Sequence, residues 1–193
     1  MAENPIHARP AAKGDICVLL ESTRTAEHRR LQQHQCALRA RFGGELINHV
    51  HLTAQRFACP DPQQLQGFIA QLEQALTGVQ PFELDAMAMQ TLYVAGMHTN
   101  FLKWRVEITN DLENLSRIIE RELVAAGITP LYVPGTTSTL VSALRNVPDL
   151  PEPELVTPEP FPFPLFTVET LIFSRIESPT AFSNLTEIRL DRQ

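Results

Sequence analysis

His51 and Thr53 are the first residues whose types and spacing suit chemistry, and they stand in the run HLTAQR, residues 51–56. Side chains alternate between the two faces of a strand, so a strand here points the imidazole and the hydroxyl to the same side. An imidazole gives or takes a proton near neutral pH, and a hydroxyl can hold a phosphate oxygen. The pair suits phosphoester chemistry, although the tripeptide taken alone fits a structural strand histidine better.

A second run, LVSALR at residues 140–145, repeats part of the first at the same spacing. The gap-free alignment matches a hydroxyl, a small residue and an arginine: Ser142 with Thr53, Ala143 with Ala54, and Arg145 with Arg56. Leu140 falls where His51 stands. A second register, which sets Thr139 at the hydroxyl position, loses the arginine match and also supplies no histidine.

Arg56 and Arg145 each follow their hydroxyl residue by three positions. On a regular strand they point away from Thr53 and Ser142, whereas a β-bulge or a strand end turns them back. Two roles therefore stay open for both guanidinium groups: a solvated or ion-paired position, and a phosphate contact.

A proton-transfer partner for His51 is not evident, because no histidine follows His98. His98 is expected on a loop away from the site. His49 shares the strand face of His51, so it either adds a second imidazole or lies at the rim of the site. Three other residues could supply the acid, although the sequence does not fix their positions: Tyr132, Glu107 and Glu169.

Hydrophobic spacing predicts the elements that position these residues. Strands are expected at residues 16–20, 48–57, 82–94, 101–109, 137–145, 166–175 and 185–190, and helices at 25–42, 61–76 and 111–126. Asp61 stands at an N-cap position with Pro62 just inside the helix. Alternation in the run 101–109 places Trp104 in the core, opposite Lys103 and Arg105, rather than against a base. The order strand–helix–strand occurs twice, which predicts an α+β fold of duplicated βαβ-type lobes.

Two segments fall outside this pattern. Residues 1–14 are expected to form a flexible tail, ahead of a single bilobal domain at 15–193. Residues 147–165 hold seven prolines and predict a loop, acting as a stiff connection or as a lid or docking arm. Phe161 and Phe163 are expected to pack on the body or on a partner rather than stay exposed.

The composition of the chain excludes several classes of function. A net charge of −6 and a pI of about 5.5 argue against a long nucleic acid, which needs a broad basic face. Three cysteines with no Cys-x-x-Cys pair indicate a reduced, cytoplasmic protein without disulfides. No His, Asp or Glu cluster has metal-ligand spacing, and no apolar run suits a membrane span. The oligomeric state stays open.

On these motifs the chain resembles the 2H phosphoesterases, the 2′-5′ RNA ligase-like family. Each lobe in that family contributes a strand reading His-x-Thr or His-x-Ser, and the second motif commonly runs His-apolar-Thr-apolar-apolar-Arg-Asn. Residues 140–146, LVSALRN, look like this run with its histidine replaced. Residues 166–174 resemble the closing strand of the family, whose apolar run ends in a serine. The resemblance extends over residues 16–190.

The resemblance implies two lobes with pseudo-twofold symmetry and antiparallel-rich sheets around a central cleft. It implies metal-independent and cofactor-independent opening of a 2′,3′-cyclic phosphate on a small nucleotide or an RNA 3′ end, with His51 as the catalytic acid or base. The substrate-binding residues carried over are Thr53, Ser142, Arg56 and Arg145. Leu140 departs from the pattern, and losing one acid or base typically costs about 10²- to 10⁴-fold in rate. Weakened catalysis is therefore expected, and the alternative is a non-catalytic module that binds a nucleotide or a phosphorylated metabolite.

Overall fold

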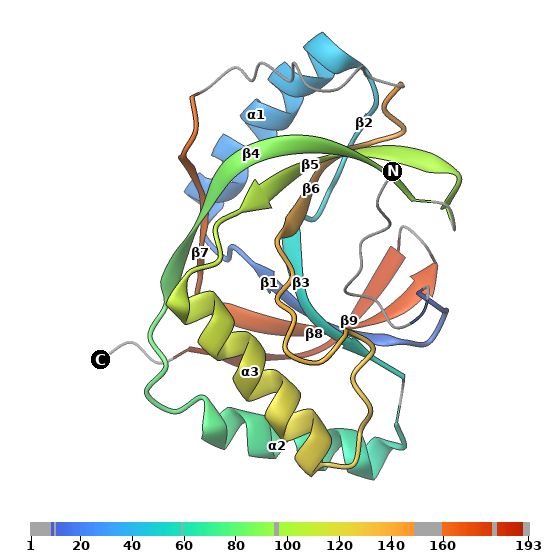
Figure 1. Cartoon of the computed structure of the whole chain (residues 1–193), viewed down its shortest axis with the longest axis vertical. Helices are drawn as coiled ribbons and strands as arrows, with labels where there is room; N and C mark the ends of the chain where they lie inside the picture. The colour runs from blue at the N-terminus through green and yellow to red at the C-terminus, as the bar shows by residue number, and fades with distance from the viewer. Residues whose placement is uncertain are drawn as a thin grey trace.

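The computed structural model describes residues 9, 11–58, 60–94, 97–148, 160–178 and 181–190, which form nine strands and three helices (Figure 1). In chain order these are β1 (Ile16–Glu21), α1 (Thr25–Phe42), β2 (Glu45–Leu46), β3 (His51–Phe57), α2 (Pro62–Ala75), β4 (Phe82–Val94), β5 (Thr99–Val106), α3 (Asn110–Ala125), β6 (Leu140–Arg145), β7 (Phe163–Val168), β8 (Thr170–Ser178) and β9 (Ala181–Arg189). No helix in these ranges is both long and apolar enough to cross a membrane.

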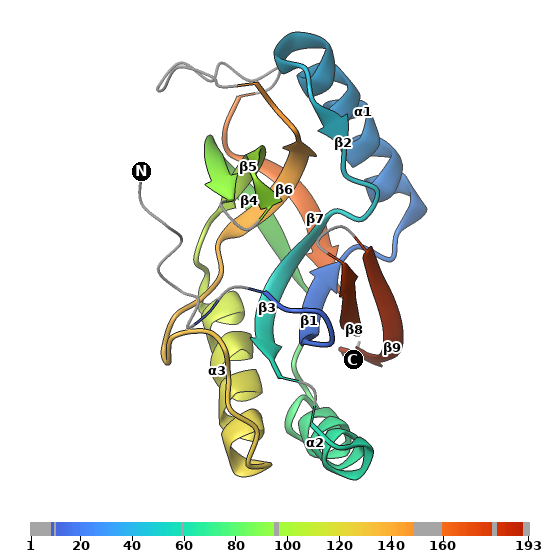
Figure 2. The ribbon, with the colours of Figure 1, turned by 90° about the vertical axis from the view of Figure 1, so that its right-hand side faces the viewer.

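The strands form two antiparallel sheets. One has the order β3-β1-β8-β9 and the other has the order β2-β6-β5-β4-β7. The strands that carry the two repeated motifs, β3 and β6, belong to different sheets but lie next to each other (Figure 2). The predicted α+β class with antiparallel-rich sheets is confirmed, and the two motif strands meet where the sheets adjoin.

One face of each sheet belongs to a common hydrophobic core. In β1, the side chains of Ile16, Val18 and Leu20 enter this core, while Cys17 and Leu19 lie on the opposite face in a separate small apolar cluster. The opposite faces of the two sheets are called the site faces below. The sidedness matters because it decides which side chains of β3 and β6 are available for chemistry.

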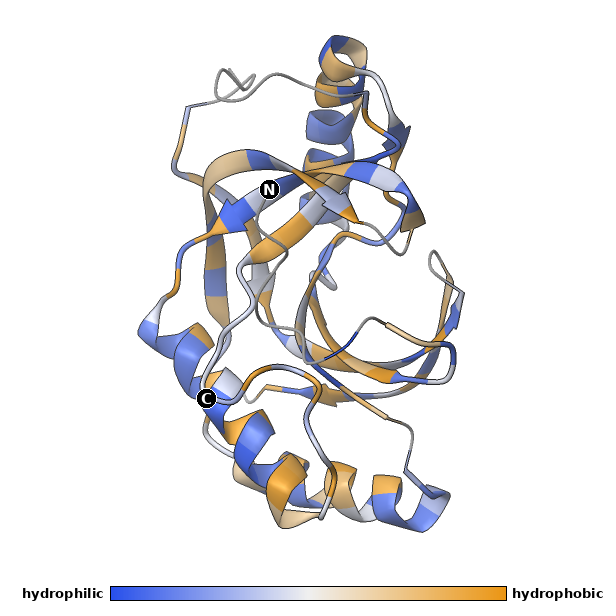
Figure 3. Cartoon of the chain, turned by 45° about the vertical axis from the view of Figure 1, so that its right-hand side comes forward, coloured by the Kyte–Doolittle hydropathy of each residue, from blue (hydrophilic) through white to orange (hydrophobic). Residues whose placement is uncertain are grey.

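Helices α2 and α3 pack against each other, and α3 also contacts β3. Asp61 caps α2 as predicted, since its carboxylate accepts from the backbone N–H groups of Gln63 and Gln64, each at 2.9 Å. Such a cap contributes about 1 kcal/mol. Hydrophobic and hydrophilic bands alternate along both helices in Figure 3, and the apolar face of α2 buries Phe68 and Leu72.

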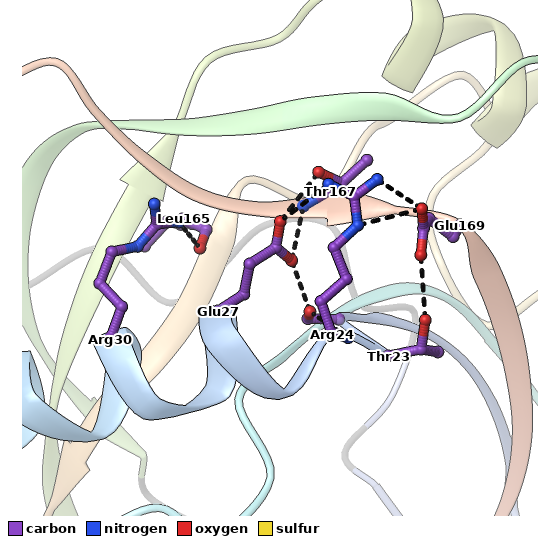
Figure 4. A network of polar contacts seen from close by, with 8 residues as sticks. Thr23, Arg24, Glu27, Arg30, Leu165, Thr167 and Glu169 are labelled. Carbon is purple, nitrogen blue, oxygen red and sulfur yellow. Dashed lines mark hydrogen bonds and ion pairs between the residues drawn. The ribbon is translucent and has the colours of Figure 1, made fainter.

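Helix α1 is held to strand β7 by polar contacts as well as by packing (Figure 4). The Glu27 carboxylate accepts from the Thr167 hydroxyl at 3.0 Å and from the Thr167 backbone N–H at 3.2 Å. Arg24 forms an ion pair with Glu169 at the start of β8, and Arg30 donates to the Leu165 carbonyl at 2.8 Å. The contacts fix the first turns of α1 against the junction of β7 and β8.

Most predicted elements are confirmed, including the bounds of α1 and β4, but one predicted strand is wrong. The sequence predicts a single strand at residues 166–175, whereas β7 ends at Val168 and β8 begins at Thr170 in the other sheet. The break falls at Glu169, which is buried and paired with Arg24. No glycine, proline or asparagine occurs near Glu169 to signal a turn. The chain continues in an extended conformation as it passes from one sheet to the other. The sequence also gives no prediction of the short strand β2.

The two segments outside the repeat lie largely beyond the described residues. Residues 149–159 of the proline-rich segment are outside them, and the predicted loop is too long at its end because β7 begins at Phe163. Phe163 is buried and stacks on Phe161, as expected for aromatic rings packed on the body. Of the predicted tail, residues 1–8 and 10 lie outside the described ranges, and Gly14 donates to the Ile176 carbonyl at 2.8 Å.

Candidate functional site

Strand β3 brings His51, Thr53 and Arg56 to one face. Its register against β1 sets Thr53 opposite Leu19 and Arg56 opposite Cys17, so all three side chains lie on the site face. The register shifts within the pair and leaves Ala54 as the extra residue of a β-bulge. The bulge turns the arginine back to the side of the hydroxyl.

Strand β6 repeats this arrangement. Ser142 lies opposite Lys103 and Arg145 lies opposite Phe101, while the intervening shift leaves Ala143 as the extra residue. The two bulges therefore fall at the two alanines that the sequence alignment matched. Of the alternatives left open, the bulge is the one that the structure has, and it places Ser142 and Arg145 on the site face.

Both arginines are engaged by other groups of the protein. Arg56 is 5% exposed, donates to the Arg9 carbonyl, and has its Nε 3.7 Å from the Asp15 carboxylate. Arg145 donates from its Nε to Glu45 on β2 at 2.9 Å. The ion-paired alternative is thus observed for both, and a phosphate contact by either remains a prediction.

His51 is half-buried at the start of β3, and its ring is held from two sides. Its Nδ1 lies 3.0 Å from the His49 carbonyl, and its ring meets Phe182 edge-on at a centroid distance of 5.6 Å. A carbonyl only accepts, so Nδ1 carries the proton and Nε2 keeps its lone pair. Burial, aided by the nearby charges of Lys103 and His49, lowers the pKa of His51 to about 4. The imidazole is therefore neutral at pH 7, with Nε2 as its acceptor atom.

Lys103 is the residue of the site that the sequence interpretation missed. It lies directly opposite Ser142 on β5, and its Nζ stands 5.2 Å from the centroid of the Phe101 ring. Within the described part of the chain no carboxylate lies within ion-pair distance of its ammonium. Burial lowers the pKa of Lys103 to about 8, and its charge reaches His51. The site thus combines a neutral imidazole from one sheet with an ammonium from the other.

The other residues considered as acids have different surroundings. Tyr132 is buried and donates to the Thr53 carbonyl at 3.2 Å, so it supports β3 through the backbone, and burial raises the pKa of its hydroxyl. Glu169 is paired with Arg24, and Glu107 is exposed just after β5. His98 is exposed on the turn between β4 and β5, which confirms the expected loop position.

His49 is exposed and lines a pocket of about 280 Å³ beside the site, between α1 and the segment that precedes β3. Glu21 and His28 also line this pocket, and Glu21 is the β1 partner of His51. His49 takes part in the site through its carbonyl, which accepts from His51. Among the described residues no group of three or more His, Cys, Asp or Glu side chains could hold a metal ion.

Neither the family models nor the curated proteins compared with this sequence match it. Solved structures do match. E. coli LigT with 3′-AMP is 12% identical at a TM-score of 0.65, over 94% of this chain and 100% of LigT. A protein described as a phosphoesterase is 13% identical at a TM-score of 0.64, with the same coverage. A Thermus thermophilus protein is 19% identical at a TM-score of 0.61, over 91% of this chain and 97% of that protein. The chain therefore has the α+β fold of the LigT-like 2H phosphoesterases.

Proposed function

We propose that the site binds a small nucleotide or an RNA 3′ end through its phosphate and opens a 2′,3′-cyclic phosphate slowly, without a metal. The observation that carries this proposal is the imidazole of His51, held at Nδ1 by the His49 carbonyl so that Nε2 is the acceptor, on the same strand face as Thr53. In the reaction Nε2 takes a proton from the attacking water. Thr53 and Ser142 donate to oxygens of the phosphate.

The ligands of proteins with this fold support the choice of substrate class. E. coli LigT has been crystallised with 3′-AMP, ATP, NADP⁺ and phosphate. All four ligands carry a phosphoryl group, and three of them are nucleotides. A compact nucleotide also suits a chain of net charge −6, since a few local donors suffice to hold it.

Leu140 favours a second candidate function, a module that binds nucleotides without turnover. It occupies the position in β6 that matches His51 in β3, and an aliphatic side chain cannot move a proton. Phosphate binding needs donors only, so binding tolerates this replacement better than catalysis does.

Incubation of the purified chain with nucleoside 2′,3′-cyclic phosphates, followed by ³¹P NMR, separates the two candidates. Slow turnover that falls at least about 100-fold in His51→Ala supports the catalytic proposal. The matched control is His98→Ala on the exposed turn, which is expected to leave the rate unchanged. Turnover that survives His51→Ala rejects the mechanism. Saturable binding of 3′-AMP in calorimetry, without turnover, establishes the second candidate.

The proposal includes a cytoplasmic location, where free thiols persist. Cys17 and Cys36 are both free thiols, the first buried and the second exposed. Burial raises the pKa of the Cys17 thiol to about 12, which keeps it unreactive. Cell fractionation followed by immunoblotting tests this location.

A further inference from the structure

Lys103 is a half-buried cation without a compensating charge. The described residues place no carboxylate within ion-pair distance of it, and its ammonium contacts the Phe101 ring at 5.2 Å. Burying an unpaired charge is costly, and such a group commonly serves a ligand of opposite charge. Lys103 is one of two lysines in the chain, the other being the exposed Lys13.

Lys103 lies on the same face of β5 as the position opposite the gap in the second motif, two residues along the strand. On β5 it lies beside Ser142, while Leu140, at the position that matches His51, lies beside Arg105. The charge of Lys103 acts on His51 across the boundary between the two sheets. The two arginines that the sequence offers for phosphate have carboxylate partners, Asp15 for Arg56 and Glu45 for Arg145. Of these three cations, Lys103 is the one without a carboxylate partner among the described residues, and it lies directly beside Ser142.

We infer that Lys103 takes the place of the missing second histidine, holding the phosphate and protonating the leaving oxygen. This inference rests on the proposed function. Nε2 of His51 takes a proton from water as the water oxygen bonds to phosphorus. The bond from phosphorus to one ribose oxygen breaks, and the Lys103 ammonium gives its proton to that oxygen, which leaves as a hydroxyl group. Solvent then carries the proton from His51 back to Lys103, so charge and atoms balance.

Burial is the cause of the lowered pKa of Lys103, and its charged and titratable neighbours come from three strands besides its own. His51 faces it from β3, Arg105 shares its strand and face, and Arg145 extends from β6 with Glu45 of β2 as partner. An alkaline loss of activity that disappears in Lys103→Gln reports Lys103. The expected midpoint is near pH 8.

Four variants of the full chain test the inference, with a nucleoside 2′,3′-cyclic phosphate as substrate and 3′-AMP as binding probe. Lys103→Gln is expected to lower kcat at least about 100-fold and to weaken 3′-AMP binding. Lys103→Arg keeps the charge but holds its proton too firmly, so KM stays near the wild-type value while kcat falls. Adding Leu140→His to Lys103→Gln restores turnover and moves the alkaline limb to about pH 6.5. Lys13→Gln is the matched control and changes nothing.

Each result bears on the inference in a defined way. Wild-type kcat in Lys103→Gln, or an alkaline limb that this variant leaves in place, overturns the role of Lys103 while the proposed function stands. Binding of 3′-AMP without turnover by the wild type overturns proton transfer by Lys103 and leaves nucleotide binding intact. Neither binding nor turnover by the wild type overturns the proposed function itself. Thermal denaturation of each variant confirms that a lost activity is not a lost fold.

Discussion

At the scale of single residues, Lys103 illustrates the conflict between stability and binding. A folded protein that keeps an ammonium half-buried and unpaired carries a desolvation cost, which a bound phosphate would offset. The lowered pKa of Lys103, to about 8, measures this cost, because the unfolded chain holds the same proton with a pKa of about 10.4. Below pH 8 both states are protonated and the full cost applies. As the pH rises from 8 to 10.4 the folded state loses its proton first and the cost fades.

Lys103→Met is therefore expected to stabilise the free protein while weakening nucleotide binding. The free energy of unfolding at pH 7 should rise by up to about 3 kcal/mol, and the gain should shrink toward zero near pH 10.5. Urea denaturation at the two pH values measures the difference. Lys13→Met serves as the exposed control, and an equal gain at both pH values would show that apolar packing, not charge burial, is responsible.

At the scale of elements, one carboxylate accepts two of the hydrogen bonds that attach α1 to β7. The Glu27 carboxylate accepts hydrogen bonds from the hydroxyl and the backbone N–H of Thr167 (Figure 4). It also accepts a hydrogen bond from the Ser22 hydroxyl. Thr167 is only 7% exposed. If Glu27 were truncated, water could therefore hardly replace it as the acceptor for the Thr167 hydroxyl and backbone N–H. Unsatisfied buried donors cost about 1–3 kcal/mol each.

Glu27→Ala is expected to lower the free energy of unfolding by about 2–3 kcal/mol, since it leaves the Thr167 N–H without an acceptor. Chemical denaturation measures the loss. Glu113→Ala is the matched control, because Glu113 pairs with Arg117 on the exposed side of α3 and should cost less than about 1 kcal/mol. Equal losses in the two variants would refute the anchoring role.

Elements were more predictable than their connections in space. The N-cap at Asp61 and the apolar spacing of α3 are local signals, and both helices occur where expected. The switch between sheets at Glu169 leaves no local signal, since the residues on both sides are strand-forming. The two bulges at Ala54 and Ala143 were only an open alternative, because a bulge is defined by the neighbouring strand and not by its own sequence.

The candidate site was also predictable only where its residues are close in sequence, and not where strand pairing brings them together. His51, Thr53 and Ser142 carry a recognisable motif, so the sequence could propose them. Lys103 becomes part of the site only through the register of β5 on β6, which a single sequence does not reveal. The alternation of side chains correctly predicts that Lys103 lies on the face opposite the buried Trp104. It does not predict that Ser142 is the neighbour of Lys103 on β6.

At the scale of the whole molecule, the two sheets and the helices share one continuous hydrophobic core. Its members include Phe68 of α2, Trp104 of β5 and Phe173 of β8, all 0% exposed. Each fully buried large apolar side chain contributes about 1.5–3 kcal/mol. The lobes are therefore not expected to unfold separately.

Urea unfolding followed by tryptophan fluorescence and by far-ultraviolet circular dichroism tests this cooperativity. Trp104 is the only tryptophan and reports one sheet, whereas circular dichroism reports all the helices and strands. The two transitions are expected to coincide. A fluorescence midpoint clearly separated from the dichroism midpoint would show that the lobes unfold independently.

The matched bulges have a consequence for how a substrate enters. Strands β3 and β6 present a hydroxyl residue and an arginine on either side of a bulge at the same spacing, so the backbone alone does not distinguish the two ends of a bound phosphodiester. The chemistry is one-sided, with an imidazole near one end and an amine near the other. If His51 and Lys103 act as proposed, only one polarity brings the departing ribose oxygen to the amine, and the site is then directional.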